Sequence, residues 1–466
     1  MSSTTLATRP THCGAAPEPE IRTCPRAATG EGHPVAFLPR TIGAGWTVPT
    51  LHGDVTYANF DHAASTPALE PVKTAVDRAL ETYASVHRGA GHASRLTSAW
   101  YEQAREEVAS FVGARPYHTV VFTRSTTDSW NLLARVLPAA ATVFVFATEH
   151  HSTLLPWDPA HTVRLPVPHS MDGALTLLDA SLHEHPSPQR LVVITAASNV
   201  TGEVWPVEAF ASLAHEHGAR LAVDAAQLAA HRPIDLAAWD ADYVAFSGHK
   251  TYAPFGAGVL AGRPDWLDEG LPYLVGGGAT RSVTPEHTAW ATGAARHEGG
   301  SPNVIGAIAL AAACATINAH RAALERHERE LQVRLRRGLA ELPGVQELAV
   351  FGPGHDRVGV VAFTVAGYES SLVSQVLSAE HGIGVRDGKF CAHPLVDELL
   401  ADPSGATPDT AVRASLGLAT TVEGVDRLVG AVRALVEHGP TGAWTRTAAG
   451  WALESDPRDV EITRPW

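Results

Sequence analysis

Residues 247–258 read Ser-Gly-His-Lys-Thr-Tyr-Ala-Pro-Phe-Gly-Ala-Gly, and this stretch decides both the fold and the chemistry. Lys250 follows a short apolar run, 243–247, and opens a glycine-rich loop. A second apolar run ends in Asp224. A lysine amine can hold an aldehyde cofactor as a Schiff base, and a carboxylate can bind the protonated nitrogen of a pyridine ring. The pair predicts a site for pyridoxal 5′-phosphate (PLP).

Both residues also have ordinary structural roles open to them. Asp224 could cap a helix, and Lys250 could be a solvated surface lysine. The chain is rich in arginine and has very few lysines. A lysine placed directly after His249, at the end of a predicted strand, therefore favours the cofactor interpretation.

The composition limits the classes of protein to which the chain can belong. Its 466 residues are 45% hydrophobic, which is enough for a large core and two or more lobes. The net charge of −14 argues against nucleic acid or an anionic membrane as a partner. Four cysteines without a CxxC pair predict neither a zinc site nor a disulfide framework, and no metal is expected.

The expected location is the cytoplasm. Free thiols fit a reducing compartment. The first residues lack a basic start followed by an apolar run, and no stretch of eighteen apolar residues occurs, so neither a secretory signal nor a membrane span is expected.

Short apolar runs alternate with stretches of helical spacing such as 207–217. The predicted strands are 120–123, 142–146, 191–195, 221–224 and 243–247. Continuous apolar strands separated by helices predict an α/β fold with a mostly parallel central sheet covered by helices on both faces.

The chain divides into four expected regions. They are a flexible arm (1–45), a large cofactor-binding domain (46–320), a smaller C-terminal α/β domain that includes part of the N-terminal segment (321–438), and a C-terminal tail that docks on the surface (439–466). A long helix from 303 to about 342, with a charged and solvated face over 321–337, is expected to link the two lobes.

Polar residues follow the predicted strands at their carboxyl ends, where ligands collect in open α/β sheets. Residues 124–131 are rich in hydroxyl groups and would begin a helix, whose free N–H groups suit a phosphate. An ordinary helix cap explains the same residues. A histidine in 148–152 could stack on a flat ring, or could be a surface or capping histidine.

Three further candidates lie at loops. Asn199 could contact a phenolate oxygen or a substrate carboxylate, or could be a turn residue before Gly202. Arg386 could clamp a carboxylate with two hydrogen bonds. Cys391 lies among positive charges that would favour its thiolate, although most free cysteines are partly buried and inert. Cys314, on an apolar helix face, is expected to be inert.

Taken in order, these motifs resemble the class V aminotransferase group of fold-type I PLP enzymes, and most closely the group II cysteine desulfurases and selenocysteine lyases. The resemblance runs from about residue 57 to about residue 436. It rests on segments 61–65, 123–127, 149–152, 198–202, 224–227, 247–250, 276–278, 298–303, 385–392 and 413–416.

The resemblance implies a role for each matching residue. Lys250 would hold PLP and move the Cα proton, Asp224 would pair with the pyridine nitrogen, and His150 would stack on the ring. Gln227 would contact the phenolic oxygen, and the phosphate would be bound by Thr126, Thr127, Ser247 and His249. Ser301 would reach the phosphate of a second subunit, which implies a homodimer. Asn199 and Arg386 would hold the substrate carboxylate, and Cys391 would accept sulfur as a persulfide.

The sequence departs from the family at the cysteine. Lys389 and Phe390 stand where group II desulfurases usually have two histidines, and His393 stands where Gln or Met is common. These changes alter the mouth of the site and leave the cofactor residues intact.

The leading hypothesis is desulfuration of L-cysteine, or a close analogue, to alanine, with transfer to a possible sulfur-acceptor protein. One alternative is a C–S β-lyase acting on a cysteine conjugate, which needs Lys250 and Arg386 but not Cys391. Another is an aminotransferase or epimerase of secondary metabolism. A non-enzymatic scaffold would need neither Lys250 nor Asp224.

Overall fold

The computed structural model describes residues 38–466, apart from 402–407, 449, 459–462 and 466. Leu38–Trp466 form one compact unit. The greater part of the predicted N-terminal arm, with Cys13 and Cys24, lies outside the described residues. Within residues 38–45, Thr41 forms a β-bridge with Leu69, so this part of the arm contacts the core.

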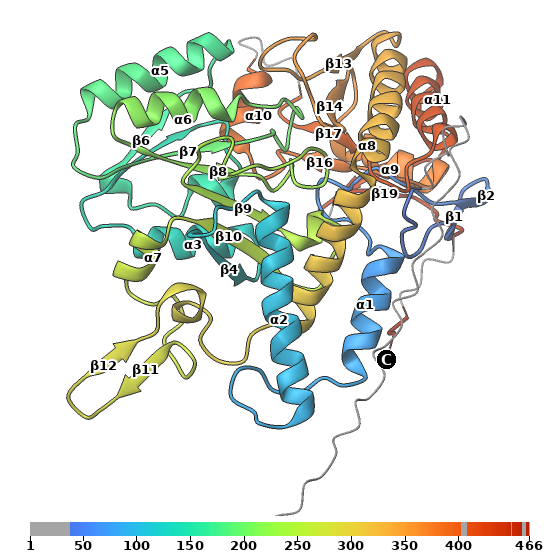
Figure 1. Cartoon of the computed structure of the whole chain (residues 1–466). Coiled ribbons are helices and arrows are strands. Elements are labelled where there is room, and N and C mark those ends of the chain that lie inside the picture. Colours follow the sequence, from blue (N-terminus) through green and yellow to red (C-terminus); the bar gives the residue numbers. More distant parts are fainter. Residues whose placement is uncertain (1–37, 402–407, 449, 459–462, 466) are drawn as a thin grey trace, which may run out of the picture. The chain divides into compact units, whose positions relative to one another are not determined.

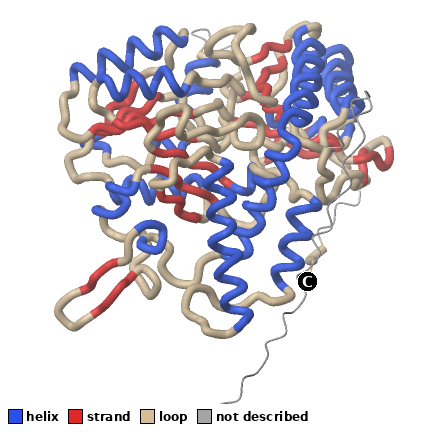
Figure 2. Tube along the Cα trace, in the orientation of Figure 1, coloured by secondary structure: helices blue, strands red, loops and turns tan. Residues whose placement is uncertain are grey.

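A seven-stranded sheet forms the centre of the fold (Figures 1 and 2). In spatial order its strands are β4 (Thr119–Thr123), β10 (Gly258–Gly262), β9 (Tyr243–Ser247), β8 (Arg220–Asp224), β7 (Arg190–Thr195), β5 (Thr142–Phe146) and β6 (Thr162–Leu165). β10 runs antiparallel to both of its neighbours, and all other pairs are parallel. The predicted α/β class and mostly parallel sheet are confirmed, while β6 and β10 were not expected.

Both faces of the sheet are covered, because alternate residues of each strand enter different clusters. On β7, Val192 and Ile194 join the cluster on one face, and Leu191 and Val193 join the cluster on the other. The first face carries α1 (Glu70–Leu80), α2 (His92–Phe111), α5 (Met171–Glu184), α6 (Val207–Glu216) and the start of α8 (Val304–Ala340). The second carries α3 (Thr126–Val136), α4 (His151–Leu154) and α7 (Pro264–Glu269). Burial on both faces explains the continuous apolar strands.

A smaller antiparallel sheet follows in the order β13 (Val345–Glu347), β14 (Val360–Val365), β17 (Ala411–Ser415) and β16 (Arg386–Gly388). Leu331 and Leu335 of α8 enter the core beside this sheet, together with α9 (Ser370–His381) and α11 (Val422–His438). The predicted domain boundary at 320/321 therefore falls within one continuous helix, and the division into domains stays a prediction.

Short elements complete the described chain. The pair β3 (Ala58–Asn59) and β15 (Ile383–Gly384) joins the N-terminal segment to the smaller lobe. The others are β1 (Thr47–Thr50), β2 (Gly53–Thr56), β11 (Thr280–Val283), β12 (Thr288–Trp290), α10 (His393–Leu399), β18 (Trp444–Thr447), β19 (Gly450–Leu453) and the 3₁₀ helices η1 (Pro159–His161), η2 (Gly248–Lys250) and η3 (Gly293–Arg296). The tail hairpin β18–β19 contacts α9, where the indole of Trp444 donates to Glu380.

The charged half of α8 is less solvated than its composition suggests. Glu328 accepts a hydrogen bond from Arg232 at 3.0 Å and pairs with His231, and Gln332 is buried with its amide donating to the carbonyl of Val358. These polar residues connect α8 to the loops of both lobes. Among the described helices, α8 alone is long and apolar enough to cross a membrane by length and composition, a test that core helices also pass.

Candidate active site

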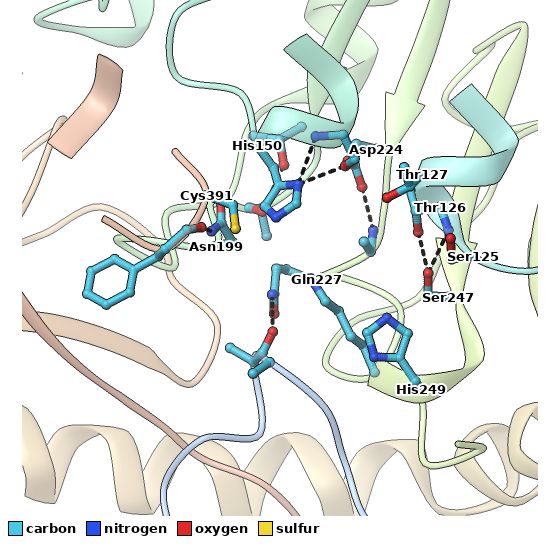
Figure 3. Close-up of a pocket in the computed structure, with 18 of the residues that line it drawn as sticks. Ser125, Thr126, Thr127, His150, Asn199, Asp224, Gln227, Ser247, His249 and Cys391 are labelled. Carbon is cyan, nitrogen blue, oxygen red and sulfur yellow. Dashed lines mark hydrogen bonds between the residues drawn. The ribbon is translucent and has the colours of Figure 1, made fainter. Parts of the chain in front are cut away.

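The parallel arrangement brings the predicted residues to one edge of the sheet. β4, β5, β7, β8 and β9 all run in the same direction, so their carboxyl ends meet there. A pocket of about 240 Å³ opens at this edge, and every predicted site residue except Ser301 lines it. Figure 3 shows Cys391 and Asn199 on one side of the pocket and Thr126, Thr127 and Ser247 on the other.

Lys250 ends the 3₁₀ turn η2, directly after β9, and its amine enters the pocket. Burial lowers the pKa of Lys250 to about 8, while the negative charge of Asp224 opposes the shift. The amine therefore loses its proton far more readily than that of a solvated lysine. A lysine that is neutral slightly above neutral pH can act as a nucleophile or as a proton acceptor.

Asp224 is the last residue of β8 and is only 4% exposed. Its Oδ1 accepts from the backbone N–H of Ala226 at 2.9 Å, and its Oδ2 accepts from the hydroxyl of Thr153 and from the indole of Trp130. These donors fix the orientation of the carboxylate.

Glu149 is a second buried acid close to Asp224. The sequence alone did not predict a role for its side chain. Its Oε1 accepts from the N–H of Thr195 at 3.0 Å, whereas its buried Oε2 has no hydrogen-bond partner among the residues that the structure describes. Burial, followed by the negative charge of Asp224, raises the pKa of Glu149 well above its ordinary value. Glu149 therefore holds a proton more readily than an ordinary glutamic acid.

The amino end of α3 forms a cradle of donors beside β9. Ser125 caps the helix by accepting from the N–H of Asp128, as its hydroxyl-rich sequence predicted. The hydroxyl of Ser247 accepts from the N–H of Thr126 at 2.7 Å and lies 2.7 Å from the Thr126 hydroxyl. With Thr127 and His249 also lining the pocket, hydroxyls and a positive helix end converge on one corner that suits an anion.

His150 caps α4, and its ring lies at the pocket. Its Nδ1 accepts from the backbone N–H of Ser152 at 3.1 Å, so the neutral ring carries its proton on Nε2. Burial, together with the charge of Lys250, lowers the pKa of His150 to about 3. A neutral imidazole can stack on a flat, electron-poor ring without charge repulsion.

The opposite wall comes from residues 386–393 of the smaller lobe, which we call the cysteine loop. Phe390 and Cys391 both have left-handed backbones, with φ of 51° and 55°, and such conformations cost about 1–3 kcal/mol each in non-glycine residues. The carbonyl of Cys391 accepts from the N–H of His151 at 2.7 Å. Its thiol is exposed, whereas Cys314 is buried in α8 as expected.

Asn199 ties the cysteine loop to the sheet edge. Its Nδ2 donates to the carbonyl of Phe390 at 2.8 Å, across 191 residues of sequence. The Asn199 side chain was predicted to contact a ligand, but its Nδ2 group supports the cysteine loop. The Gln227 amide likewise donates to the carbonyl of Ala63 at 2.8 Å.

Two arginines reach the pocket from the smaller lobe, and only Arg386 was among the predicted residues. The buried Arg413 donates to the carbonyl of Asn199 and to Asp61, while its Nε has no hydrogen-bond partner within the described part of the chain. Burial lowers the pKa of Arg413 to about 10, against the effect of Asp61. Its guanidinium lies 5.1 Å from the ring centre of Phe390. All five residues of β17 are buried, and a lone arginine between apolar residues would by itself predict a solvent-facing side chain, so no local signal placed this cation inside.

Ser301 is the one predicted residue that the structure does not bring to the pocket. It is exposed in the loop before α8, where its neighbour Gly300 donates to the carbonyl of Gly277. The pocket of a single chain therefore contains no contribution from Ser301.

The residues of the pocket fit PLP. The anion cradle at α3 suits a phosphate, the Lys250 amine suits an aldehyde, and the charged Asp224 suits a protonated ring nitrogen. The unpartnered Nε of Arg413 is a buried donor close to the pocket. One cavity therefore contains groups that match the phosphate, the aldehyde and the protonated ring nitrogen of PLP.

Comparison with known proteins agrees with this geometry. The family model "Aminotransferase class-V" matches residues 58–428. A cysteine desulfurase of Klebsiella pneumoniae is 36% identical over 82% of this chain and 94% of its own length. A probable cysteine desulfurase of Vibrio cholerae is 32% identical over 81% of this chain and 93% of its own.

Solved structures give the same result. The apo cysteine desulfurase of Thermococcus onnurineus has a TM-score of 0.74 at 31% identity, covering 85% of this chain and 98% of that one. The cysteine desulfurase CsdA of Escherichia coli has a TM-score of 0.69 at 32% identity, covering 82% and 95%. The chain therefore belongs to the class V aminotransferase family, as an enzyme related to cysteine desulfurases.

Proposed function

We propose that the chain uses PLP to cleave the C–S bond of L-cysteine, or of a close analogue, to give alanine and a persulfide on Cys391. One observation carries the proposal: the exposed thiol of Cys391 and the buried amine of Lys250 line the same pocket. The similarity to cysteine desulfurases covers nearly the whole length of those proteins, which supports the same assignment.

The residues of the sheet edge would hold the cofactor. Lys250 would take its aldehyde, Asp224 its ring nitrogen and His150 the face of its ring, with Gln227 at the phenolic oxygen. The phosphate would lie against Thr126, Thr127, Ser247 and His249. When bound, PLP withdraws electrons from the substrate Cα and so makes its proton acidic. Asp224 would support that withdrawal by pairing with the ring nitrogen, because its hydrogen bonds hold the carboxylate in a fixed orientation.

Lys250 would accept the Cα proton. Its lowered pKa of about 8 leaves a useful fraction of neutral amine near neutral pH, and the protonated form can return the proton later. His150, with its pKa lowered to about 3, remains neutral throughout and does not compete for this proton.

The substrate carboxylate would bind at the cationic wall. Arg386 is about half exposed and lies 3.5 Å from Asp61, so it is free to turn toward a ligand. Arg413 is fixed by Asn199 and Asp61 and supplies a buried positive charge. Asn199 remains a candidate for the same carboxylate and also supports the cysteine loop.

Cys391 would then take the sulfur. Its thiolate attacks the substrate Sγ, so an S–S bond forms on Cys391 as the Cβ–Sγ bond breaks. Cβ keeps the electron pair of the broken bond and takes a proton, which gives alanine. The exposure of Cys391 leaves the persulfide accessible to a sulfur-acceptor protein. A reduced thiol is required, which supports a cytoplasmic location.

We also propose that the enzyme is a homodimer in which Ser301 enters the partner's site. The segment before Ser301 exposes several large apolar side chains, Leu271, Leu274, Val275 and Val283, the last on the hairpin β11–β12 (Figure 1). Exposed apolar side chains in one segment are typical of protein interfaces. Light scattering would give the mass, and Ser301→Ala should weaken PLP binding without changing that mass; a monomer would contradict the proposal.

The decisive variant is Cys391→Ala, with Cys314→Ala as the matched control because Cys314 is buried in α8 and does not line the pocket. We expect Cys391→Ala to retain the visible absorbance of bound PLP and to form no alanine or persulfide from L-cysteine. Cys314→Ala should form both products. Alanine production that is unchanged in Cys391→Ala would contradict desulfuration by this residue, and pyruvate without alanine would instead indicate a C–S β-lyase.

A further inference from the structure

Two His-Glu-His triplets end neighbouring helices, and none of their residues lines the pocket. Residues 183–185 lie at the end of α5, and residues 215–217 lie at the end of α6. The two helices are in contact and lie side by side in Figure 1. Neither triplet has a part in the proposed reaction.

One carboxylate brings a histidine from each triplet together. The Oδ1 of Asp179 lies 2.7 Å from the Nε2 of His217 and 3.5 Å from the Nδ1 of His183. Asp179 and His183 are four residues apart on α5, so they lie on the same face of the helix. One ligand atom from each of the three residues lies within 4.8 Å of those from the other two.

These distances are close to those of a metal site. In a tetrahedral zinc site with metal–ligand bonds of about 2.0–2.1 Å, neighbouring ligand atoms are about 3.3 Å apart. Two imidazoles and a carboxylate are common ligands of divalent transition metals. Side-chain rotation alone can close the remaining gap, because His183 is 69% exposed and Asp179 is 49% exposed.

The side chain of Arg190 connects the two helix ends. Arg190 of β7 donates to the carbonyl of Leu182, at the end of α5, at 3.0 Å, and also to the carbonyl of His217. His217 itself is only 14% exposed, so its ring is held against α5. Helix carboxyl ends favour cations, and Glu184 and Glu216 add negative charge nearby, while the positive charge of Arg190 opposes them.

We propose that Asp179, His183 and His217 form a site for a divalent transition-metal ion such as Zn²⁺, with water in the remaining position, that links α5 to α6. The absence of a CxxC pair predicts no metal, but cysteine spacing does not detect histidine and aspartate ligands that come from two helices. The site is independent of the proposed desulfuration, because no residue of the pocket takes part. The competing explanation is an ion pair between Asp179 and protonated histidines.

Isothermal titration with Zn²⁺ on the full-length protein with PLP bound would test the site. The wild type has other zinc-binding groups, including the Cys391 thiol, so the decisive quantity is the difference in stoichiometry. We expect His183→Ala/His217→Ala and Asp179→Asn each to lose one equivalent of bound Zn²⁺. The matched control is His185→Ala, an exposed histidine two residues from His183 and outside the cluster, which should lose none.

Thermal unfolding gives a second readout, because an ion that binds only the folded state raises Tm. Added Zn²⁺ should raise the Tm of the wild type and of His185→Ala more than that of the cluster variants. Equal stoichiometry in the wild type and the cluster variants would overturn the proposal, and so would a wild type that binds no Zn²⁺. Circular dichroism without metal would show that each variant is folded.

Discussion

The two walls of the pocket are built in different ways. On the sheet edge, Asp224 and Ser247 are buried at strand ends and held by hydrogen bonds from neighbouring elements. On the cysteine loop, Cys391 is exposed, Arg386 is about half exposed, and two successive residues have left-handed backbones. The first wall is fixed by the core, whereas the second is fixed by a few contacts that cross between lobes.

This difference indicates that the two walls have different functions. A wall made from strand ends is precise because the sheet cannot shift without disturbing its packing. A wall made from a loop can change its residues at little cost to the fold. The departures from the desulfurase pattern, Lys389, Phe390 and His393, all lie on the loop wall. We therefore expect changes on the sheet wall to abolish chemistry and changes on the loop wall to alter it.

Lys250→Ala should have the largest effect. Without the amine, no residue of the sheet edge can hold the aldehyde or accept the Cα proton, so we expect the rate of alanine formation to fall at least about 1,000-fold. Borohydride treatment followed by mass spectrometry should find PLP fixed to position 250 in the wild type alone. The control is Lys73→Ala, an exposed lysine paired with Asp77 on α1. If Lys250→Ala retained activity, the sheet wall would not provide the residue that carries out the chemistry.

Asp224→Asn should come next. The amide has nearly the same shape but no charge, so the ring nitrogen would lose its partner, and we expect the rate to fall about 100-fold. The amide nitrogen would also face the donors of Thr153 or Trp130, which should lower stability by about 1–3 kcal/mol. Steady-state kinetics and urea unfolding would measure both. Asp158→Asn, at the exposed cap of η1, should change neither.

The pH dependence of Lys250 can sharpen the comparison. Because its pKa is lowered to about 8, the fraction of neutral amine rises with pH and levels off above about 8, instead of rising to the ordinary pKa near 10.5. The rate at which PLP-free protein captures added PLP should rise by about tenfold per pH unit below that value. A rate that still increases steeply at pH 9.5 would show that burial does not lower the pKa of Lys250.

Asn199→Ala tests the connection between the two walls and should have a smaller effect. Loss of the hydrogen bond to Phe390 removes a support of the strained loop, so we expect alanine formation to slow about tenfold while PLP remains bound. If Asn199 acts on the loop, the rate at which iodoacetamide alkylates Cys391 should change and KM should not. A rise in KM with unchanged alkylation would instead place Asn199 on the substrate carboxylate.

Lys389→Ala should have the smallest effect. Lys389 pairs with Asp397 at 2.6 Å near the surface of the loop wall. Such a pair contributes little, so we expect stability to change by less than about 0.5 kcal/mol and the cofactor absorbance to stay the same. A measurable change in alanine yield without loss of stability would show that the loop wall selects the substrate.

Strands and their polar ends could be predicted because both are local in sequence. Continuous apolar runs gave β4, β5, β7, β8 and β9, and the residues that follow these strands were brought to one edge by their shared direction. β10 was not expected, since glycines bound its short sequence Gly-Val-Leu-Ala-Gly. β6 was not predicted, because only some of its four residues are apolar and buried.

The sequence by itself determined the sheet, the cofactor residues and the presence of a cysteine near positive charge, because a strand, its end and the polar residue after it lie within about ten positions. Only the tertiary structure decided that Arg413 enters the pocket, that Glu149 is buried close to Asp224, and that Asn199 supports Phe390. The contact between Asp179 and His217 was likewise decided only by the tertiary structure. Each depends on how helices and strands far apart in the chain pack together, and packing places side chains in contact that no local pattern of residues relates.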